Sequence, residues 1–266
     1  MTQSVYMNSD KDNDLTVSIL QTDIIWCNPE KNRAHIEELI DASPHSDLFV
    51  LPEMFTTGFC MAPQQINHAE QEETVTWMQE LCRKYHCAIT GSIIANEEER
   101  FYNRCFFIHE EDTVTYDKRH LFSYGGEDKV YTPGNKRVIV EFKGVRFLLQ
   151  ICYDLRFPVF SRNKEDYDAI IYVANWPVAR INVWNTLLSA RAMENQCYVI
   201  GANRTGSDPC ATYNGSSRCI DPYGRILASC TDYAESSCSA TIQTATLKAF
   251  RDKFPALKDA DKFICE

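Results

Sequence analysis

The sequence lacks the segments expected of a membrane or exported protein. No apolar run approaches the about 20 residues that cross a bilayer. The first 14 residues are polar and acidic, without the apolar core of a signal peptide or the arginines of a transit peptide. We therefore expect residues 1–14 to form a polar tail, followed by a single cytoplasmic domain over residues 15–266.

A basic stripe is also missing. The chain has 27 lysines and arginines against 37 aspartates and glutamates, which gives a net charge of −10 at neutral pH. Its most basic stretch is only Lys118–His120. Nucleic acids and anionic membranes attract proteins through clustered positive charge. We therefore expect no nucleic acid and no membrane as a partner.

Several common catalytic signatures are absent. The chain contains no Gly-x-Gly, no Gly-x-x-x-x-Gly-Lys and no Gly-x-Ser-x-Gly. Dinucleotide-binding loops, Walker-type phosphate loops and the serine α/β-hydrolase motif are thus excluded. The six histidines lack the spacing of metal ligands, and none follows Cys152, which excludes a papain-like order for that residue. No motif implies a metal or another cofactor.

Cysteine, by contrast, is abundant. The 12 cysteines are scattered irregularly, without the Cys-x-x-Cys pair of a zinc knuckle or a thioredoxin-type site. Several, such as Cys105 and Cys197, stand in apolar strand-like runs, where a free thiol behaves as a small hydrophobic group. We expect most of them in the core. A non-catalytic thiol sensor is the alternative function that this cysteine content suggests.

Strand-like and helix-like segments alternate along the chain. The expected helices cover residues 29–40, 72–85, 183–196 and 246–251. The expected strands cover residues 17–20, 48–51, 88–95, 101–109, 113–116, 137–142, 145–151, 169–174, 197–202, 218–220, 225–229 and 239–243. Tight turns are expected at Lys143-Gly144 and at residues 221–224. Because hairpins accompany the crossovers, this order predicts an α/β domain with mixed sheets.

Three segments carry side chains suited to catalysis. Glu53 follows an apolar strand directly after Pro52, and Lys118 ends a hairpin. The strand 145–151 runs into Cys152, and Pro158 is suited to begin a helix, as in a nucleophile elbow with free backbone N–H groups. The ordinary alternatives are a solvated acid for Glu53, a surface charge for Lys118 and a core thiol for Cys152.

Together these segments resemble the nitrilase superfamily, the carbon–nitrogen hydrolases with a Glu-Lys-Cys triad. The similarity extends from Gln21 to the segment 254–261. The resemblance implies that Glu53, Lys118 and Cys152 form the triad, and that Glu127 is the second active-site carboxylate. For Glu127 the alternative is a solvated loop acid. The family also implies a four-layer αββα sandwich and a homodimer.

The finer similarity is to the omega-amidase branch, through LPEMFTTGF, DKRHLF, CYDLRFP and ANWP. True nitrilases tend to have Trp-Glu after the nucleophile, where this chain has Tyr153-Asp154. The resemblance implies a small-molecule amide substrate, the terminal amide of α-ketoglutaramate or α-ketosuccinamate. Another linear amide or an N-carbamoyl compound is the alternative within the family.

The expected mechanism gives each group one role. Glu53 takes the thiol proton, Lys118 lowers the pKa of the thiol, and Cys152 attacks the amide carbonyl. Lys118 and the backbone N–H of Tyr153 stabilise the oxyanion, while Glu127 orients Lys118 or the substrate nitrogen. Water activated by Glu53 then hydrolyses the thioester.

The anchor for the far carboxylate of such a substrate is not apparent from the sequence. Asn175 and Trp176 follow the strand 169–174 and are expected to line the pocket. For Trp176 the alternative is that it packs only in the core or at a dimer interface. We interpret Arg156 as a structural residue that bridges to an acid near Cys152, and Cys197 as a core residue.

Overall fold

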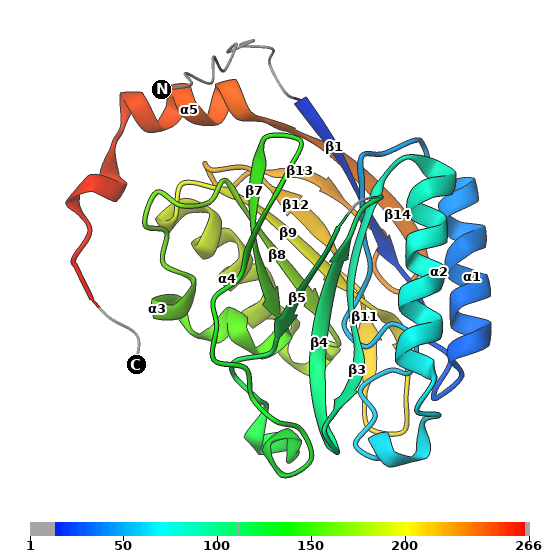
Figure 1. Cartoon of the computed structure of the whole chain (residues 1–266). Helices are drawn as coiled ribbons and strands as arrows, with labels where there is room; N and C mark the ends of the chain where they lie inside the picture. The colour runs from blue at the N-terminus through cyan, green and yellow to red at the C-terminus, as the bar shows by residue number, and fades with distance from the viewer. Residues whose placement is uncertain (1–13, 111, 264–266) are drawn as a thin grey trace, which may run out of the picture.

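The computed structural model describes residues 14–110 and 112–263. Two sheets and their helices form four layers in the order helix, sheet, sheet, helix (Figure 1). This arrangement confirms the expected αββα sandwich with mixed sheets. Of the expected N-terminal tail, residues 1–13 lie outside the described residues, and Asp14 is the first residue of strand β1.

In the described part of the chain, six strands form the first sheet: β1 (Asp14–Gln21), β2 (Leu48–Val50), β3 (Ala88–Glu97), β4 (Arg100–Ile108), β5 (Thr113–Asp117) and β14 (Ser236–Gln243). Their order is β14-β1-β2-β3-β4-β5, with β1, β2 and β3 parallel and the other pairs antiparallel. The outer face is covered by helices α1 (Pro29–Ala42) and α2 (Glu70–Tyr85) (Figure 1).

The second sheet also has six described strands: β6 (Ile139–Phe142), β7 (Val145–Ile151), β8 (Ala169–Ala174), β9 (Tyr198–Asn203), β12 (Arg218–Ile220) and β13 (Ile226–Ser229). Their order is β13-β12-β9-β8-β7-β6, with β7, β8 and β9 parallel. Its outer side carries α3 (Pro158–Ser161) and α4 (Ile181–Glu194), and α5 (Thr244–Lys253) follows β14 (Figure 1). A separate hairpin consists of β10 (Thr205–Ser207) and β11 (Thr212–Asn214).

Apolar side chains at alternate strand positions hold the layers together. Ile19 of β1 and Leu149 of β7 point inward and belong to one core cluster between the two sheets. On the outer faces, Met78 of α2 and Trp184 of α4 pack each helix onto its sheet. Full burial of a side chain of this size stabilises the fold by about 1.5–3 kcal/mol.

The expected helices and strands are confirmed, and none of their ends is shifted by more than three residues. Lys143 and Gly144 both have positive φ angles, as a two-residue hairpin turn requires. Cys105 and Cys197 are buried in core clusters, as expected. The hairpin β10–β11 was not predicted, because its strands are only three residues long and largely polar. Among the described helices, none has the length and apolar composition needed to cross a membrane.

Candidate active site

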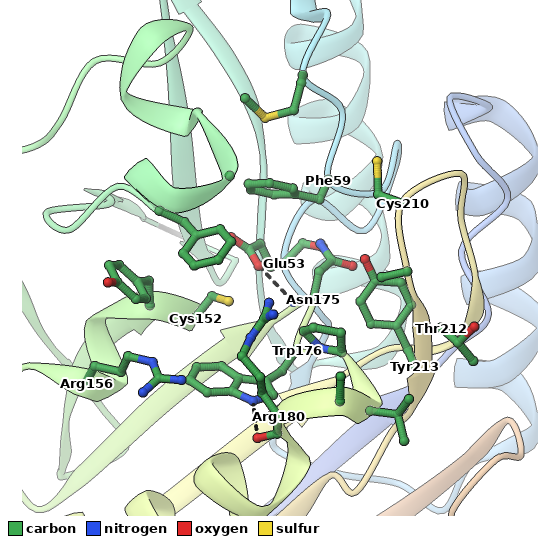
Figure 2. Close-up of a pocket in the computed structure, with 18 of the residues that line it drawn as sticks. Glu53, Phe59, Cys152, Arg156, Asn175, Trp176, Arg180, Cys210, Thr212 and Tyr213 are labelled. Carbon is green, nitrogen blue, oxygen red and sulfur yellow. Dashed lines mark hydrogen bonds between the residues drawn. The ribbon is translucent and has the colours of Figure 1, made fainter.

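Strands of both sheets end around one pocket of about 480 Å³ (Figure 2). Glu53 follows β2, Lys118 follows β5, Cys152 follows β7 and Asn175 follows β8. Ligands in open α/β sheets bind at the carboxyl ends of strands, because loops from neighbouring strands converge there. The structure therefore brings the three residues of the predicted triad to one pocket.

Cys152 stands on a sharp turn between β7 and a short 3₁₀ helix, Cys152–Arg156. Its φ angle is +46°, a left-handed conformation that a residue with a side chain adopts only when its surroundings enforce it. The N–H groups in the first turn of a helix have no partner within the helix. The N–H of Tyr153 belongs to this turn. The strand–cysteine–turn geometry is thus that of the expected nucleophile elbow, and Cys152 lines the pocket.

A buried cluster of three charged residues lies beside Cys152. Lys118 Nζ is 2.8 Å from Glu53 Oε1, and 3.0 and 2.9 Å from the two carboxylate oxygens of Glu127. The three side chains are at most 1% exposed. The alternatives of a surface charge for Lys118 and of solvated acids for Glu53 and Glu127 are therefore wrong. Both oxygens of Glu127 contact the lysine, so Glu127 fixes its position.

The electrostatics of this cluster favour a charged lysine and a protonated thiol. Burial alone lowers the pKa of Lys118, but the charges of Glu127 and Glu53 outweigh it and hold that pKa well above its usual value. Burial raises the pKa of Cys152 well above its usual value, and the charge of Glu53 raises it further. Lys118 lowers the thiol pKa, as expected, but does not dominate. The thiol therefore needs a base, and Glu53 lines the same pocket as Cys152 (Figure 2).

Asn175 lines the pocket, as predicted, and also holds Glu53 in place. The backbone N–H of Asn175 donates to Glu53 Oε2 at 2.8 Å, and its side-chain Nδ2 donates to the backbone oxygen of Glu53 at 2.8 Å. The next residue is fixed in turn by Asn203, which accepts from the Trp176 N–H at 2.7 Å and donates to the Trp176 carbonyl at 3.0 Å. These hydrogen bonds thus hold the loop after β8 in contact with Glu53, the expected base.

Trp176 takes part in both the pocket and the core. Its ring packs near that of Trp184, with centroids 5.5 Å apart, and the residue is only 3% exposed. It also lines the pocket beside Cys152 and Arg156 (Figure 2). The expectation that Trp176 lines the pocket is therefore confirmed, and the alternative that it packs only in the core or at a dimer interface is wrong.

The interpretation of Arg156 as a bridge to a nearby acid is wrong. The acid beside the elbow, Asp154, instead accepts hydrogen bonds from Tyr116, His120 and the Ile151 N–H. The Arg156 guanidinium lies 5.2 Å from the ring centre of Trp176 and lines the pocket.

Arg180 is a second pocket arginine, and no motif in the sequence marks it. Its guanidinium lies 5.2 Å from the ring centre of Phe122. Figure 2 shows Arg156 and Arg180 beside Trp176, with Cys152 and Glu53 close by. Within residues 14–110 and 112–263, neither guanidinium forms an ion pair with a carboxylate. Two charged donors of this pocket are therefore available to an anionic ligand.

Comparisons with known proteins agree with this geometry. The model of the carbon–nitrogen hydrolase family matches residues 16–252. Omega-amidase YafV from Yersinia enterocolitica is 42% identical over 94% of this chain and 98% of its own length. The 2-oxoglutaramate amidase of Bacillus subtilis is 35% identical over 80% of this chain and 85% of its own length. The crystal structure of XC1258 from Xanthomonas campestris, a CN-hydrolase superfamily protein with an arsenic adduct in the active site, has a TM-score of 0.91. It is 39% identical, with 95% of this chain and 99% of that chain covered.

Proposed function

Because this chain belongs to the carbon–nitrogen hydrolase family, we propose that it hydrolyses the terminal amide of an omega-amido 2-oxo acid to a 2-oxo dicarboxylate and ammonia. The substrates are α-ketoglutaramate and α-ketosuccinamate. One observation carries the proposal: a cysteine on an elbow, beside a carboxylate base, shares its pocket with two unpaired arginines. Such a pocket accommodates a molecule with an amide at one end and a carboxylate at the other.

The arginines supply recognition for the carboxylate end. A guanidinium is always charged, and its planar N–H groups pair with the two oxygens of a carboxylate. Arg156 and Arg180 are both partly exposed within the pocket, so a substrate can reach them. An amide held at its far end by this pair presents its carbonyl to Cys152. Neutral amides without the carboxylate lack this attraction.

The first half of the reaction forms a thioester. Glu53 accepts the thiol proton while the sulfur of Cys152 attacks the carbonyl carbon. Negative charge develops on the carbonyl oxygen, where the Lys118 ammonium and the Tyr153 N–H stabilise it. The proton held by Glu53 then passes to the amide nitrogen, the carbon–nitrogen bond breaks, and ammonia leaves.

The second half of the reaction restores the enzyme. Glu53 is a carboxylate again and removes a proton from a water molecule, whose oxygen attacks the thioester carbonyl. The same oxyanion donors act a second time. The carbon–sulfur bond breaks, Cys152 regains its proton, and the dicarboxylate is released. Lys118 and Glu127 keep their charges throughout, because the two buried groups face each other at 2.9 Å.

Ammonia release from a small panel of compounds tests the proposal. The panel contains the two keto-amides, glutamine, a carbamoyl amino acid and a simple nitrile. We expect turnover of the keto-amides, and a fall of roughly 10³-fold or more in Cys152→Ala, because the nucleophile is removed. The variant Cys238→Ala is the matched control, since it removes another partly buried thiol, from β14, and should keep full activity.

Each other result of the panel has a clear meaning. Preferred turnover of the carbamoyl compound or of glutamine would retain the mechanism and refute the substrate assignment. Substantial activity in a folded Cys152→Ala protein would refute the mechanism. No ammonia release from any compound of the panel would favour a non-catalytic thiol sensor.

We further propose that the enzyme works in the cytoplasm as a homodimer. Helix α4 supports the dimer, because it presents apolar side chains to the core and one to the solvent. Trp184 and Leu188 are buried in the core, Leu187 packs against the same cluster, and Met193 is 51% exposed. Burial of such an exposed apolar side chain in an interface is favourable.

A further inference from the structure

Asn103 contacts three of the charged residues of the site. It lies on β4, on the face that also presents Cys105 to the core between the sheets, and is fully buried. Its Nδ2 donates to Glu53 Oε1 at 2.7 Å and to Glu127 Oε1 at 3.1 Å. Its backbone oxygen accepts the N–H of Lys118 at 3.0 Å. The proposed mechanism does not use this residue.

The orientation of the Asn103 amide is set by a neighbouring hydroxyl. The backbone N–H of Met54 donates to Ser92 Oγ at 2.9 Å, which leaves the hydroxyl proton free to point elsewhere. That proton goes to Asn103 Oδ1, also at 2.9 Å. An amide has an acceptor end and a donor end, and the acceptor end is occupied by Ser92. The two N–H bonds of the donor end therefore face the carboxylates.

The carboxylates need this donor because they share one cation. Glu53 and Glu127 are both buried and both contact the same Lys118 nitrogen. Burial raises the pKa of Glu127, and the charge of Glu53 raises it further, while Lys118 lowers it. The titratable and charged groups that face the pair are Lys118, the thiol of Cys152, and the phenols of Tyr131 and Tyr213. Within the described residues, Lys118 is the cation among them.

We propose that Asn103 is a positioning residue whose two amide N–H bonds hold Glu53 and Glu127 in place and direct Glu53 toward Cys152. One N–H of the amide bonds to each carboxylate, and a hydrogen bond to the charged form favours that form. The proton of Cys152 then has a carboxylate ready to accept it. This inference rests on the proposed role of Glu53 as the base.

The variant Asn103→Leu tests the proposal, because leucine has a similar volume and no donor. Without the two N–H bonds, the carboxylate pair takes up a proton more easily. The acid limb of the kcat/KM profile should therefore move up by about 1 pH unit. We expect kcat to fall by roughly tenfold or more and KM to change little, since Asn103 is buried behind Glu53.

A second readout needs no substrate. Alkylation of Cys152 by iodoacetamide, followed by peptide mass spectrometry, reports the pH at which the thiol loses its base. The exposed Cys210 is an internal reference in the same sample. In Asn103→Leu, the low-pH midpoint of Cys152 alkylation should move up with the acid limb. If no keto-amide is turned over, the substrate assignment fails while this measurement still tests Asn103.

Ser92→Ala keeps the proposal testable if Asn103→Leu does not fold. It frees the Asn103 amide to rotate, and a smaller shift in the same direction is expected. Thr90→Val is the matched control on the same strand, because the Thr90 hydroxyl contacts Cys105 and no carboxylate. The proposal would be overturned if folded Ser92→Ala and folded Asn103→Leu kept the wild-type pH midpoint of Cys152 alkylation. Their loss of activity would then follow only the fall in melting temperature.

Discussion

At the scale of single residues, the site consists of charges that the fold has removed from water. Glu53, Lys118 and Glu127 are almost fully buried and compensate one another. Burial of an ion costs several kcal/mol, and close opposite charges with good hydrogen bonds offset that cost. The removal of one member therefore affects folding as well as catalysis.

The variant Lys118→Met should show this through the pH dependence of its stability. Burial already raises the pKa of Glu127, and Lys118 is the first of the influences that lower it. Without Lys118, the folded state holds its proton up to a higher pH than the unfolded state does. Stability is then retained near pH 4 and lost as the pH rises toward 7. We expect a loss of about 3–5 kcal/mol in the free energy of unfolding at pH 7.

Urea unfolding at pH 5 and pH 7.5 measures this effect. Lys143→Met is the control, because it removes an exposed lysine that pairs with Asp47. Its cost should be at most about 1 kcal/mol. An equal loss for Lys118→Met at both pH values would contradict the prediction.

At the scale of elements, the local sequence pattern predicted the helices and strands whose apolar residues recur at a regular spacing, and the turns marked by glycine. The strand before Cys152, the Lys143-Gly144 turn and helix α2 all have strong local signals. The hairpin β10–β11 has none, because it is held by a distant contact. Arg204, fully buried, donates to Asp23 at 3.0 Å and lies 4.6 Å from the ring centre of Tyr213. No local pattern reveals a partner 181 residues away.

The same limit explains the site residues that were predicted and missed. Glu53, Lys118 and Cys152 stand in recognisable motifs, so their resemblance to a family located them. Asn103 and Arg180 stand in no motif quoted from the sequence, and their importance depends on what other strands and loops bring beside them. Proximity along the chain is also a poor guide for Arg156, because the neighbouring Asp154 already accepts hydrogen bonds from other donors.

The β10–β11 hairpin should be sensitive to a single methyl group. Gly206 has a φ angle of +81°, and a Cβ there would collide with the Asp23 carboxylate. Gly206→Ala should therefore destabilise the protein by more than about 1 kcal/mol and displace Tyr213 from the pocket wall. Thermal unfolding and KM for the keto-amides measure the two effects.

Gly126→Ala is the control for that experiment. Gly126 has a similar φ angle of +79°, but a Cβ there would meet nothing within 4 Å. Its cost is the backbone strain alone, about 1 kcal/mol. The idea of a crowded hairpin fails if the two variants unfold at the same temperature.

At the scale of the whole molecule, we place the contact of the proposed homodimer on the outer surface of α4. Met193→Glu puts a charge on the exposed part of this helix. A charge buried in an interface costs several kcal/mol. Sedimentation should show a dimer for the wild type at micromolar concentration, and a monomer for Met193→Glu.

Ile25→Glu is the matched control, since Ile25 is 44% exposed and lies between β1 and α1, away from α4 in the chain. It should remain dimeric. A monomeric wild-type protein would contradict the dimer itself. A dimer that survives Met193→Glu would place the interface elsewhere.

The distribution of the site over two sheets has a consequence for folding experiments. Glu53 and Lys118 extend from strands of one sheet, while Cys152 and Asn175 extend from strands of the other. Neither sheet alone holds a complete set of reacting groups. Turnover therefore reports the packing of the two sheets against each other. During refolding, ammonia release begins only when both sheets have formed and packed together. A partly folded species with one formed sheet would have regular secondary structure and yet be catalytically silent.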